Sequence, residues 1–161
     1  MKKLIALITL CAATFSVTAD EAFLQLSLTP DIALQSRDTV IKGISLNIWG
    51  ENEQSGFTLG LVNGSTGDSS GLSWGIVNYA ENYSGVELGF VNYVSEEFKG
   101  VQLGGVNVAM AASGLQWGFV NYAEDLRGVQ LGFINIATEN PWFEEFPDKL
   151  ATVFPFVNWS F

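Results

Sequence analysis

The sequence predicts an all-β protein, and we expect a small antiparallel up-and-down β-barrel of about 8–10 strands built from 14–15-residue repeats. One motif, G-h-x-L/W-G-h-V-N with h a large apolar residue, recurs between Gly56 and Ala137. Its six copies begin at Gly56, Gly71, Gly85, Gly100, Gly114 and Gly128. Apolar residues alternate within every copy, which is the two-residue period of a β-strand. A fixed period indicates that each unit buries its apolar side against its neighbours.

The N-terminal segment, residues 1–19, has the layout of a secretory signal peptide. Lys2 and Lys3 precede an apolar run from Leu4 to Phe15, and small residues lead to Ala19, after which we expect cleavage. The apolar run is shorter than the roughly 20 residues that a membrane-spanning helix needs. We therefore expect residues 1–19 to be removed and residues 20–161 to form a single all-β repeat domain.

The composition that remains after cleavage argues against several functions. Residues 20–161 contain neither cysteine nor histidine, and the loss of Lys2 and Lys3 takes the formal net charge from −10 to −12. The two side chains most used for catalysis at neutral pH are then missing, and an acidic surface repels the phosphates of nucleic acid. We expect no enzyme activity, no catalytic residue, no cofactor or metal site, and no nucleic-acid partner.

Two further strands precede the repeats, and each repeat has two different faces. Residues 22–30 alternate as a strand that ends at Pro30, and residues 39–50 are a degenerate copy of the motif. In the fifth repeat, one face carries Trp117 and Phe119 and the other carries Gln116 and Gly118. One face is therefore large and apolar, and the other is small and partly polar. Acidic residues concentrate in the short connections, where they solvate turns and protect sheet edges.

Two features near the C-terminus are candidate contact or targeting sites. The long connection over residues 138–148 holds three aromatic residues, which form a possible contact loop or fold back as a lid: Trp142, Phe143 and Phe146. The terminal strand alternates and ends on an aromatic residue, through Val157, Trp159 and Phe161. It resembles the C-terminal targeting strand of bacterial outer-membrane β-barrel proteins. That resemblance implies the outer membrane as location, with lipid and the barrel assembly machinery as partners.

The repeats also resemble those of bacterial surface-repeat proteins, which have tandem G-x-Q-x-G-x-x-N units and end in a Pro-Phe-x-Asn-aromatic strand. The resemblance runs from about Leu24 to the C-terminus and includes the segment from Pro155 to Trp159. It implies a β architecture in the cell envelope, with periplasm or cell surface as the alternative location, and transfers no activity or cofactor. Gly105 and Gly64 depart from the repeat at positions that are elsewhere larger.

Two architectures can bury such units. In the barrel, the large apolar residues face lipid and the polar positions face the interior, namely Glu87, Gln102, Gln116 and Gln130. However, we count nine strands, whereas single-chain bacterial barrels have even numbers. The alternative is a parallel β-solenoid, in which each unit is one coil and the motif asparagines stack as a ladder. So short a coil would then have to hold the large apolar residues in a narrow interior, and we therefore prefer the barrel.

The function expected from these patterns is that of a non-enzymatic structural protein of the outer membrane or cell envelope. The alternative is a surface-exposed β-solenoid interaction or adhesion module with an unknown surface ligand. A hydrolase ranks last, because serine and aspartate are present but a histidine base is not.

Overall fold

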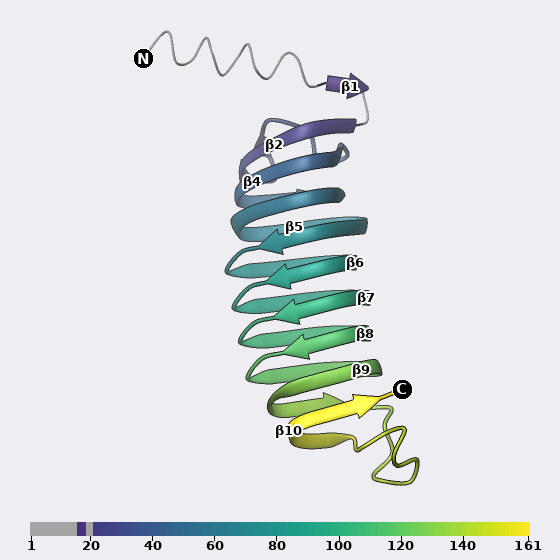
Figure 1. Cartoon of the computed structure of the whole chain (residues 1–161). Coiled ribbons are helices and arrows are strands. Elements are labelled where there is room, and N and C mark those ends of the chain that lie inside the picture. The colour runs from purple at the N-terminus through teal and green to yellow at the C-terminus, as the bar shows by residue number, and fades with distance from the viewer. Residues whose placement is uncertain (1–15, 19–20) are drawn as a thin grey trace.

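The computed structural model describes residues 16–18 and 21–161 and shows a parallel β-solenoid, in which the chain winds as coils stacked along one axis (Figure 1). The expectation of an all-β protein is confirmed. The strands are β1 (Ser16–Thr18), β2 (Glu21–Thr29), β3 (Ile32–Ala33), β4 (Val40–Asn52), β5 (Gln54–Trp74), β6 (Val77–Leu88), β7 (Val91–Leu103), β8 (Val106–Trp117), β9 (Val120–Ala137) and β10 (Val153–Ser160). Among the described residues, no helix is long and apolar enough to cross a bilayer.

The predicted antiparallel barrel is wrong, because the strands that contain the repeats pair in parallel. β4 to β9 follow one another in a parallel ladder, and β2 joins it through β4. The pairing sets equivalent residues side by side, as where Asn107 faces Asn121 and Gly114 faces Gly128. Only parallel, in-register stacking lets identical side chains of successive units form ladders. An antiparallel meander reverses every second unit and loses that match.

In the four middle repeats the L-G-h centre is a corner of the coil, a bend that separates two strands, whereas Gly60 lies inside β5 and Gly132 inside β9. The chain bends at Gly89–Phe90, at Gly104–Gly105 and at Gly118–Phe119. β8 therefore begins with the V-N of one unit and ends with the first residues of the next. The large residues that flank the corner glycine lie on the outside, as the exposed fractions of Trp117 (59%) and Phe119 (61%) show.

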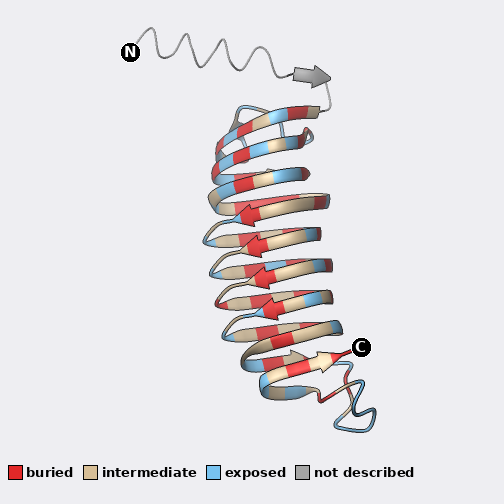
Figure 2. Ribbon diagram, in the orientation of Figure 1, coloured by how far each residue is buried: buried red, intermediate tan, exposed pale blue. Residues whose placement is uncertain are grey.

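The interior of the coils is built largely from polar and small side chains. Figure 2 shows buried positions recurring at matching places in successive coils. The buried polar residues include the motif asparagines and the glutamine positions: Asn47, Asn63, Asn78, Asn92, Asn107, Asn121, Asn135, Glu87, Gln102, Gln116 and Gln130. The expectation that a solenoid interior would hold the large apolar residues is therefore wrong. A narrow coil closes because asparagine, glutamine and alanine occupy its centre, and the bulky residues lie outside.

Hydrogen bonds between these polar side chains run along the axis from coil to coil. The Nδ2 of Asn92 donates to Oδ1 of Asn107 at 2.8 Å, and Asn107 donates to Asn121 at the same distance. A second ladder runs from Gln130 through Gln116 to Gln102, again at 2.8 Å per bond. Buried polar groups that are paired in this way avoid the desolvation cost that unpaired groups incur. The asparagine ladder expected for a solenoid is thus confirmed.

Two glycine columns make this close stacking possible. Gly100 has φ +133°, and a Cβ there would overlap the carbonyl oxygen of Gly85 in the preceding coil. The corner glycine is packed as closely, because a Cβ on Gly104 would overlap the carbonyl oxygen of Gly89 and lie 2.8 Å from Nδ2 of Asn92 in the asparagine ladder. The first position needs both an unusual backbone conformation and empty space, and only glycine provides both.

A small apolar column completes the core. It consists of Ala80, Tyr83, Val94, Phe98, Ala109, Ala112, Ala123, Leu126 and Ala137. Along one row of this column Tyr83 stacks on Phe98, Phe98 on Ala112, and Ala112 on Leu126. The small Ala112 between Phe98 and Leu126 leaves room for both large side chains in the narrow interior.

The two ends of the solenoid are closed differently from its middle. At the N-terminal end, Nε2 of Gln25 donates to Oδ1 of Asn52 at 2.8 Å, and Asn52 donates to backbone carbonyls of the segment before β4. At the C-terminal end, β10 pairs antiparallel with β9, and its register shifts next to Pro155. The antiparallel β10 ends the parallel ladder at β9, and at the other end β1 and β3 pair antiparallel with β2.

The predicted signal peptide lies mostly outside the described residues. Of residues 1–19, only the backbone of β1 is described, and it pairs with the start of β2.

Candidate interaction surface

Large apolar side chains line the outside of the solenoid from its first coils to its last, and we call this surface the ridge. It is formed by the residues that flank the coil corners, most of them from the L-G-h units. Phe90, Phe119 and Phe133 are 65%, 61% and 62% exposed, although each is a large apolar residue. The ridge comprises Leu26, Leu28, Leu46, Ile48, Leu59, Leu61, Trp74, Ile76, Leu88, Phe90, Leu103, Trp117, Phe119, Leu131, Phe133 and Phe156.

The ridge has two rows of side chains with the corner residues as a floor between them, and this floor is hollowed near each end. The hollow at the N-terminal end has a volume of about 560 Å³ and is lined by leucine and isoleucine around Ser27, Asn47 and Gly60. The hollow at the C-terminal end has a volume of about 500 Å³ and lies over Gly104, Gly118 and Gly132. At the C-terminal end, glycine at the corner positions leaves space between the two rows and creates the depression.

The side chains of the ridge change in kind along the axis. The N-terminal hollow is walled by aliphatic residues. Aromatic rings wall the C-terminal one, where Phe119 stacks on Phe133 with ring centroids 5.6 Å apart, and Phe133 meets Phe156 edge-on at 6.3 Å. The ridge is therefore apolar throughout. Its N-terminal end, with aliphatic side chains, is the slim end, and its C-terminal end, with aromatic side chains, is the bulky end.

The corner segments of the described coils consist of uncharged residues. Acidic residues cluster about half a coil further along the chain, as with Glu96 and Glu97 after Gly89, and half a coil later is the opposite side of the solenoid. The floor also satisfies its own backbone groups, since Gly104 N–H donates to Trp117 O and Gly118 N–H donates to Leu131 O, both at 3.0 Å. The ridge thus suits an apolar partner surface better than a charged or hydrogen-bonding ligand.

Gly105 and Gly64, the two departures from the repeat, have structural reasons. A Cβ on Gly105 would lie 2.9 Å from a ring carbon of Phe90, so the glycine leaves room for that ring on the ridge. A Cβ on Gly64 would overlap the hydroxyl of Tyr79. Each glycine lets an aromatic side chain from the following or preceding coil lie across its own coil.

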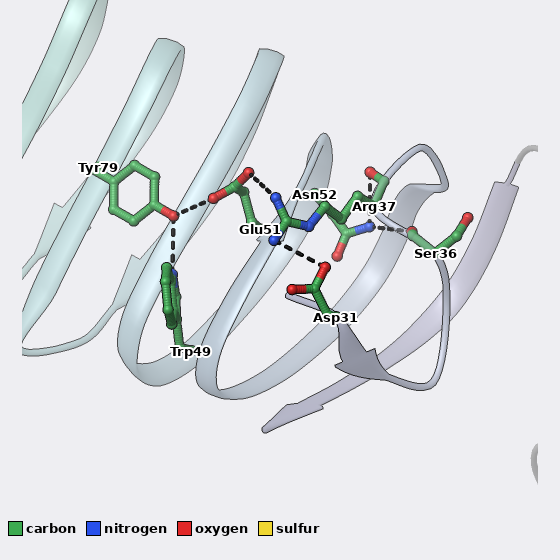
Figure 3. Close-up of polar contacts among 7 residues, drawn as sticks. All are labelled: Asp31, Ser36, Arg37, Trp49, Glu51, Asn52 and Tyr79. Atoms are coloured by element: carbon green, nitrogen blue, oxygen red, sulfur yellow. Dashed lines mark hydrogen bonds and ion pairs between the residues drawn. The ribbon is translucent and has the colours of Figure 1, made fainter. Parts of the chain in front are cut away.

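Across Gly64, Tyr79 reaches a polar cluster near the N-terminal end (Figure 3). The Tyr79 hydroxyl donates to Glu51 at 2.6 Å and accepts from Nε1 of Trp49 at 3.0 Å. Arg37 joins Glu51 to Asp31 through ion pairs of 3.3 and 3.1 Å. Burial, with the hydrogen bond to Glu51, raises the pKa of Tyr79 to about 12. The phenol therefore stays protonated and acts as a donor. Its hydrogen bonds with Glu51 and Trp49 link β6 to β4.

Glu87 is a buried carboxylate at the N-terminal end of the glutamine ladder. Only 1% of the residue is exposed, and its Oε2 accepts a hydrogen bond of 2.8 Å from Gln102. Burial raises the pKa of Glu87 to about 7, and the hydrogen bond from Gln102 opposes that rise. Burial, with the charge of Glu87, also raises the pKa of Tyr83. At the other end of the ladder, Oε1 of Gln130 is buried without a partner. This row acts within the core and not on a ligand.

The predicted contact loop folds back on the C-terminal strand and also stays exposed. Phe143 meets Phe154 edge-on at 6.0 Å, and Phe146 lies 6.3 Å from Trp159. Trp142, Phe143 and Phe146 are nevertheless 56%, 51% and 59% exposed. A lid and a contact site were the two expectations, and the loop has features of both.

The residues of the predicted targeting strand lie at the end cap. Val157 and Trp159 pair with Leu131 and Val129 of β9. Nε1 of Trp159 donates to Pro147 O at 2.8 Å, and the side chain of Phe161 is 78% exposed. The targeting role of this strand stays a prediction.

The sequence predicted that the large apolar residues face outward only if the protein was a barrel. It did not predict the two hollows. The signal was present in the L-G-h triplet, because a glycine between two outward residues leaves a gap. In the part of the chain that the structure describes, no group of three or more Asp, Glu, Cys or His side chains could hold a metal ion. Comparison with protein-family models, with curated proteins and with solved structures found no match.

Proposed function

We propose that this protein is a non-enzymatic structural protein of the bacterial cell envelope, which works as a rigid interaction module with the ridge as its binding surface. The observation that carries the proposal is the extent of the ridge. Its side chains, about half exposed, present apolar area on the order of 1,500 Å². The largest apolar patch of a typical monomer is about 300–600 Å². A surface of this size, repeated in every coil, costs solubility unless a partner covers it.

The architecture supports an interaction role in a second way. Ladders of paired side chains hold each coil on the next, so the ridge is a preorganised surface that loses little entropy on binding. Parallel solenoids with stacked repeats commonly present extended surfaces for binding. The envelope as location rests on the signal-like residues 1–19 and on the resemblance to surface-repeat proteins.

A pair of tryptophans allows a matched test of the proposal. Trp117 on the ridge and Trp142 in the C-terminal loop are 59% and 56% exposed, so that replacement by glutamate should disturb the fold of either variant little. We expect the wild type to fractionate with the cell envelope. Trp117→Glu should reduce the envelope-bound share roughly tenfold, because a buried charge opposes docking, and Trp142→Glu should leave it unchanged.

The measurement is quantitative immunoblotting of envelope and soluble fractions, with circular dichroism of the purified variants as the folding control. A wild type found in the cytoplasm would refute the location. Equal envelope binding by the wild type and Trp117→Glu would show that the ridge is not the surface that attaches the protein to the envelope. Loss of binding in Trp142→Glu alone would transfer the role to the loop.

A further inference from the structure

We propose that the partner covering the ridge is a second copy of this chain, docked face to face and antiparallel about a two-fold axis near Phe90. The inference rests on the proposed function in one respect, namely that the ridge is an interface. It adds the identity of the occupant, the orientation of the two copies and the pairing of their coils.

The spacing of the ridge favours another solenoid as partner. Parallel strands repeat every 4.7–4.9 Å or so along the axis, and the side chains on the ridge follow that repeat. A second copy has the same repeat over the same length, so its rows can interdigitate at every level as in a steric zipper. A partner with another period would match at only a few levels.

The gradation of side-chain size favours the antiparallel orientation. Phe90 belongs to the middle corner of the ridge, with the aliphatic hollow on one side of it and the aromatic hollow on the other. In an antiparallel pair, Trp117 and Phe119 face Leu59 and Leu61 of the other copy. Each bulky end then meets a slim end, whereas a parallel pair sets rings against rings.

Area and charge agree with a pair of copies. Burying roughly half of the exposed ridge on each copy removes about 800 Å² per partner, which is the size of a standard stable interface. Each chain has a formal charge of −10, or −12 without residues 1–19, but the corners are uncharged and the acidic clusters lie on the opposite side. The copies therefore approach through a large uncharged side. A laterally uniform bilayer, in contrast, gives no reason for a slim end and a bulky end.

The stoichiometry is tested by sedimentation equilibrium of the purified protein, the wild type beside Trp117→Glu, Phe119→Glu and Trp142→Glu. We expect a dimer for the wild type and for Trp142→Glu. The two ridge variants should dimerise roughly 100-fold more weakly or not at all, since the two-fold axis places the change in the interface twice. Unchanged circular dichroism establishes that the ridge variants are folded, and two independent ridge positions guard against a local defect.

The orientation is tested with single cysteines in a background that carries Cys11→Ser, which removes the one native cysteine. A short bifunctional maleimide should link Phe90→Cys to itself, because the axis passes close to that corner. Leu28→Cys alone and Phe156→Cys alone should stay unlinked. A mixture of these two variants should give a heterologous linked pair, because antiparallel docking brings the opposite ends together.

The outcomes separate this inference from the proposed function. A monomer in sedimentation, a dimer that survives both ridge variants, or self-linking of Leu28→Cys would overturn the antiparallel pair. If a monomer instead floats with neutral phosphatidylcholine vesicles and Trp117→Glu does not, the inference fails while the ridge remains a binding surface. If neither assembly nor vesicle binding responds to Trp117→Glu, both proposals fail.

Discussion

Each recurring residue of the repeat makes one particular contact between successive coils. The first glycine fits beneath the carbonyl group of the preceding coil, as Gly100 does beneath Gly85, and the corner glycine makes room for the asparagine ladder. The asparagine donates both to the next asparagine and to a backbone carbonyl, as Asn92 does to Asn107 and Leu103. The glutamine position is the variable one, and Glu87 occupies it in a single coil of the ladder.

Glu87 makes stability depend on pH, and we predict that Glu87→Gln removes this dependence. The pKa of this carboxyl rises from 4.5 in the unfolded chain to about 7 in the fold, so the folded state binds more protons between these values. Stability is therefore highest below pH 4.5 for this group, falls as pH rises to 7, and is constant above it, with a total loss of about 3 kcal/mol. Glutamine in its place keeps the acceptor for Gln102 and carries no charge.

The measurement is urea unfolding of the wild type and of Glu87→Gln at pH 5 and pH 8. We expect the variant to be more stable than the wild type at pH 8 by about 2–3 kcal/mol and to differ little at pH 5. Glu96→Gln, at an exposed position of β7, is the control and should follow the wild type. Equal slopes of stability against pH in the wild type and in Glu87→Gln would show that Glu87 does not titrate in this range.

At the scale of the strands, the sequence predicted β structure correctly. It did not predict which face of each strand points into the coil. Alternation correctly indicated β-strands, but it set the L-G-h segment in the middle of each strand, where the chain of the middle repeats bends. The asparagine ladder was foreseen for a solenoid. Alternation does not distinguish an inward face from an outward one, however. Because large apolar residues are usually buried, we expected Trp117 and Phe119 to face either lipid or a core. The interior proved to be polar because hydrogen bonds along the axis, as between Gln102 and Gln116, satisfy amides only in a parallel stack.

The candidate site was predictable only in part, for a related reason. The outward residues were identified as a set, but the hollow over Gly104 and Gly118 depends on how coils stack, which one repeat does not reveal. The ring that lies over Gly105 likewise comes from the preceding coil, where it belongs to Phe90. The loop with Trp142 was visible from its composition, because exposed aromatic residues in a long connection stand out.

The C-terminal strand gives a prediction that separates capping from targeting. Truncation before β10 removes the antiparallel cap and exposes the edge of β9, so we expect end-to-end aggregation in dynamic light scattering. Phe161→Ser alters only a side chain that is 78% exposed. It should change the free energy of unfolding by less than about 0.5 kcal/mol and leave the protein dispersed.

Because Phe161→Ser preserves the fold, its level in the outer membrane reports on targeting alone. A lower level with normal export would support a role of the terminal aromatic residue in recognition by assembly machinery. An unchanged level would leave Phe161 without a targeting role. If the truncated protein stays dispersed at the concentrations used for the wild type, β10 is not needed as a cap.

For the solenoid as a whole, stability is a sum over neighbouring coils. Every coil contacts the one before it and the one after it, and strands pair only with neighbours in the order β2, β4, β5, β6, β7, β8, β9 and β10 among the described residues of the repeat region. Proteins of this kind tolerate the gain or loss of whole repeats, because the surfaces that are newly joined resemble those that were separated. A closed structure does not share this property, since removal of one unit breaks its closure.

The last prediction applies this rule to one complete coil, which runs from Gly85 to Lys99. Its deletion joins Ser84 to Gly100, stacks Tyr83 on Ala112 and restores both the glycine column and the asparagine ladder, now from Asn78 to Asn107. We expect a folded solenoid that is shorter by one strand spacing, about 4.8 Å, as measured by small-angle X-ray scattering, with a β-type circular dichroism spectrum and cooperative unfolding. Deletion from Gly85 to Val91 instead shifts the register by half a coil, places large outward residues inside, and should abolish folding. If the full-coil deletion unfolds as completely as the half-coil deletion, the coils are not independent stacking units, and the nearest-neighbour account of this fold is wrong.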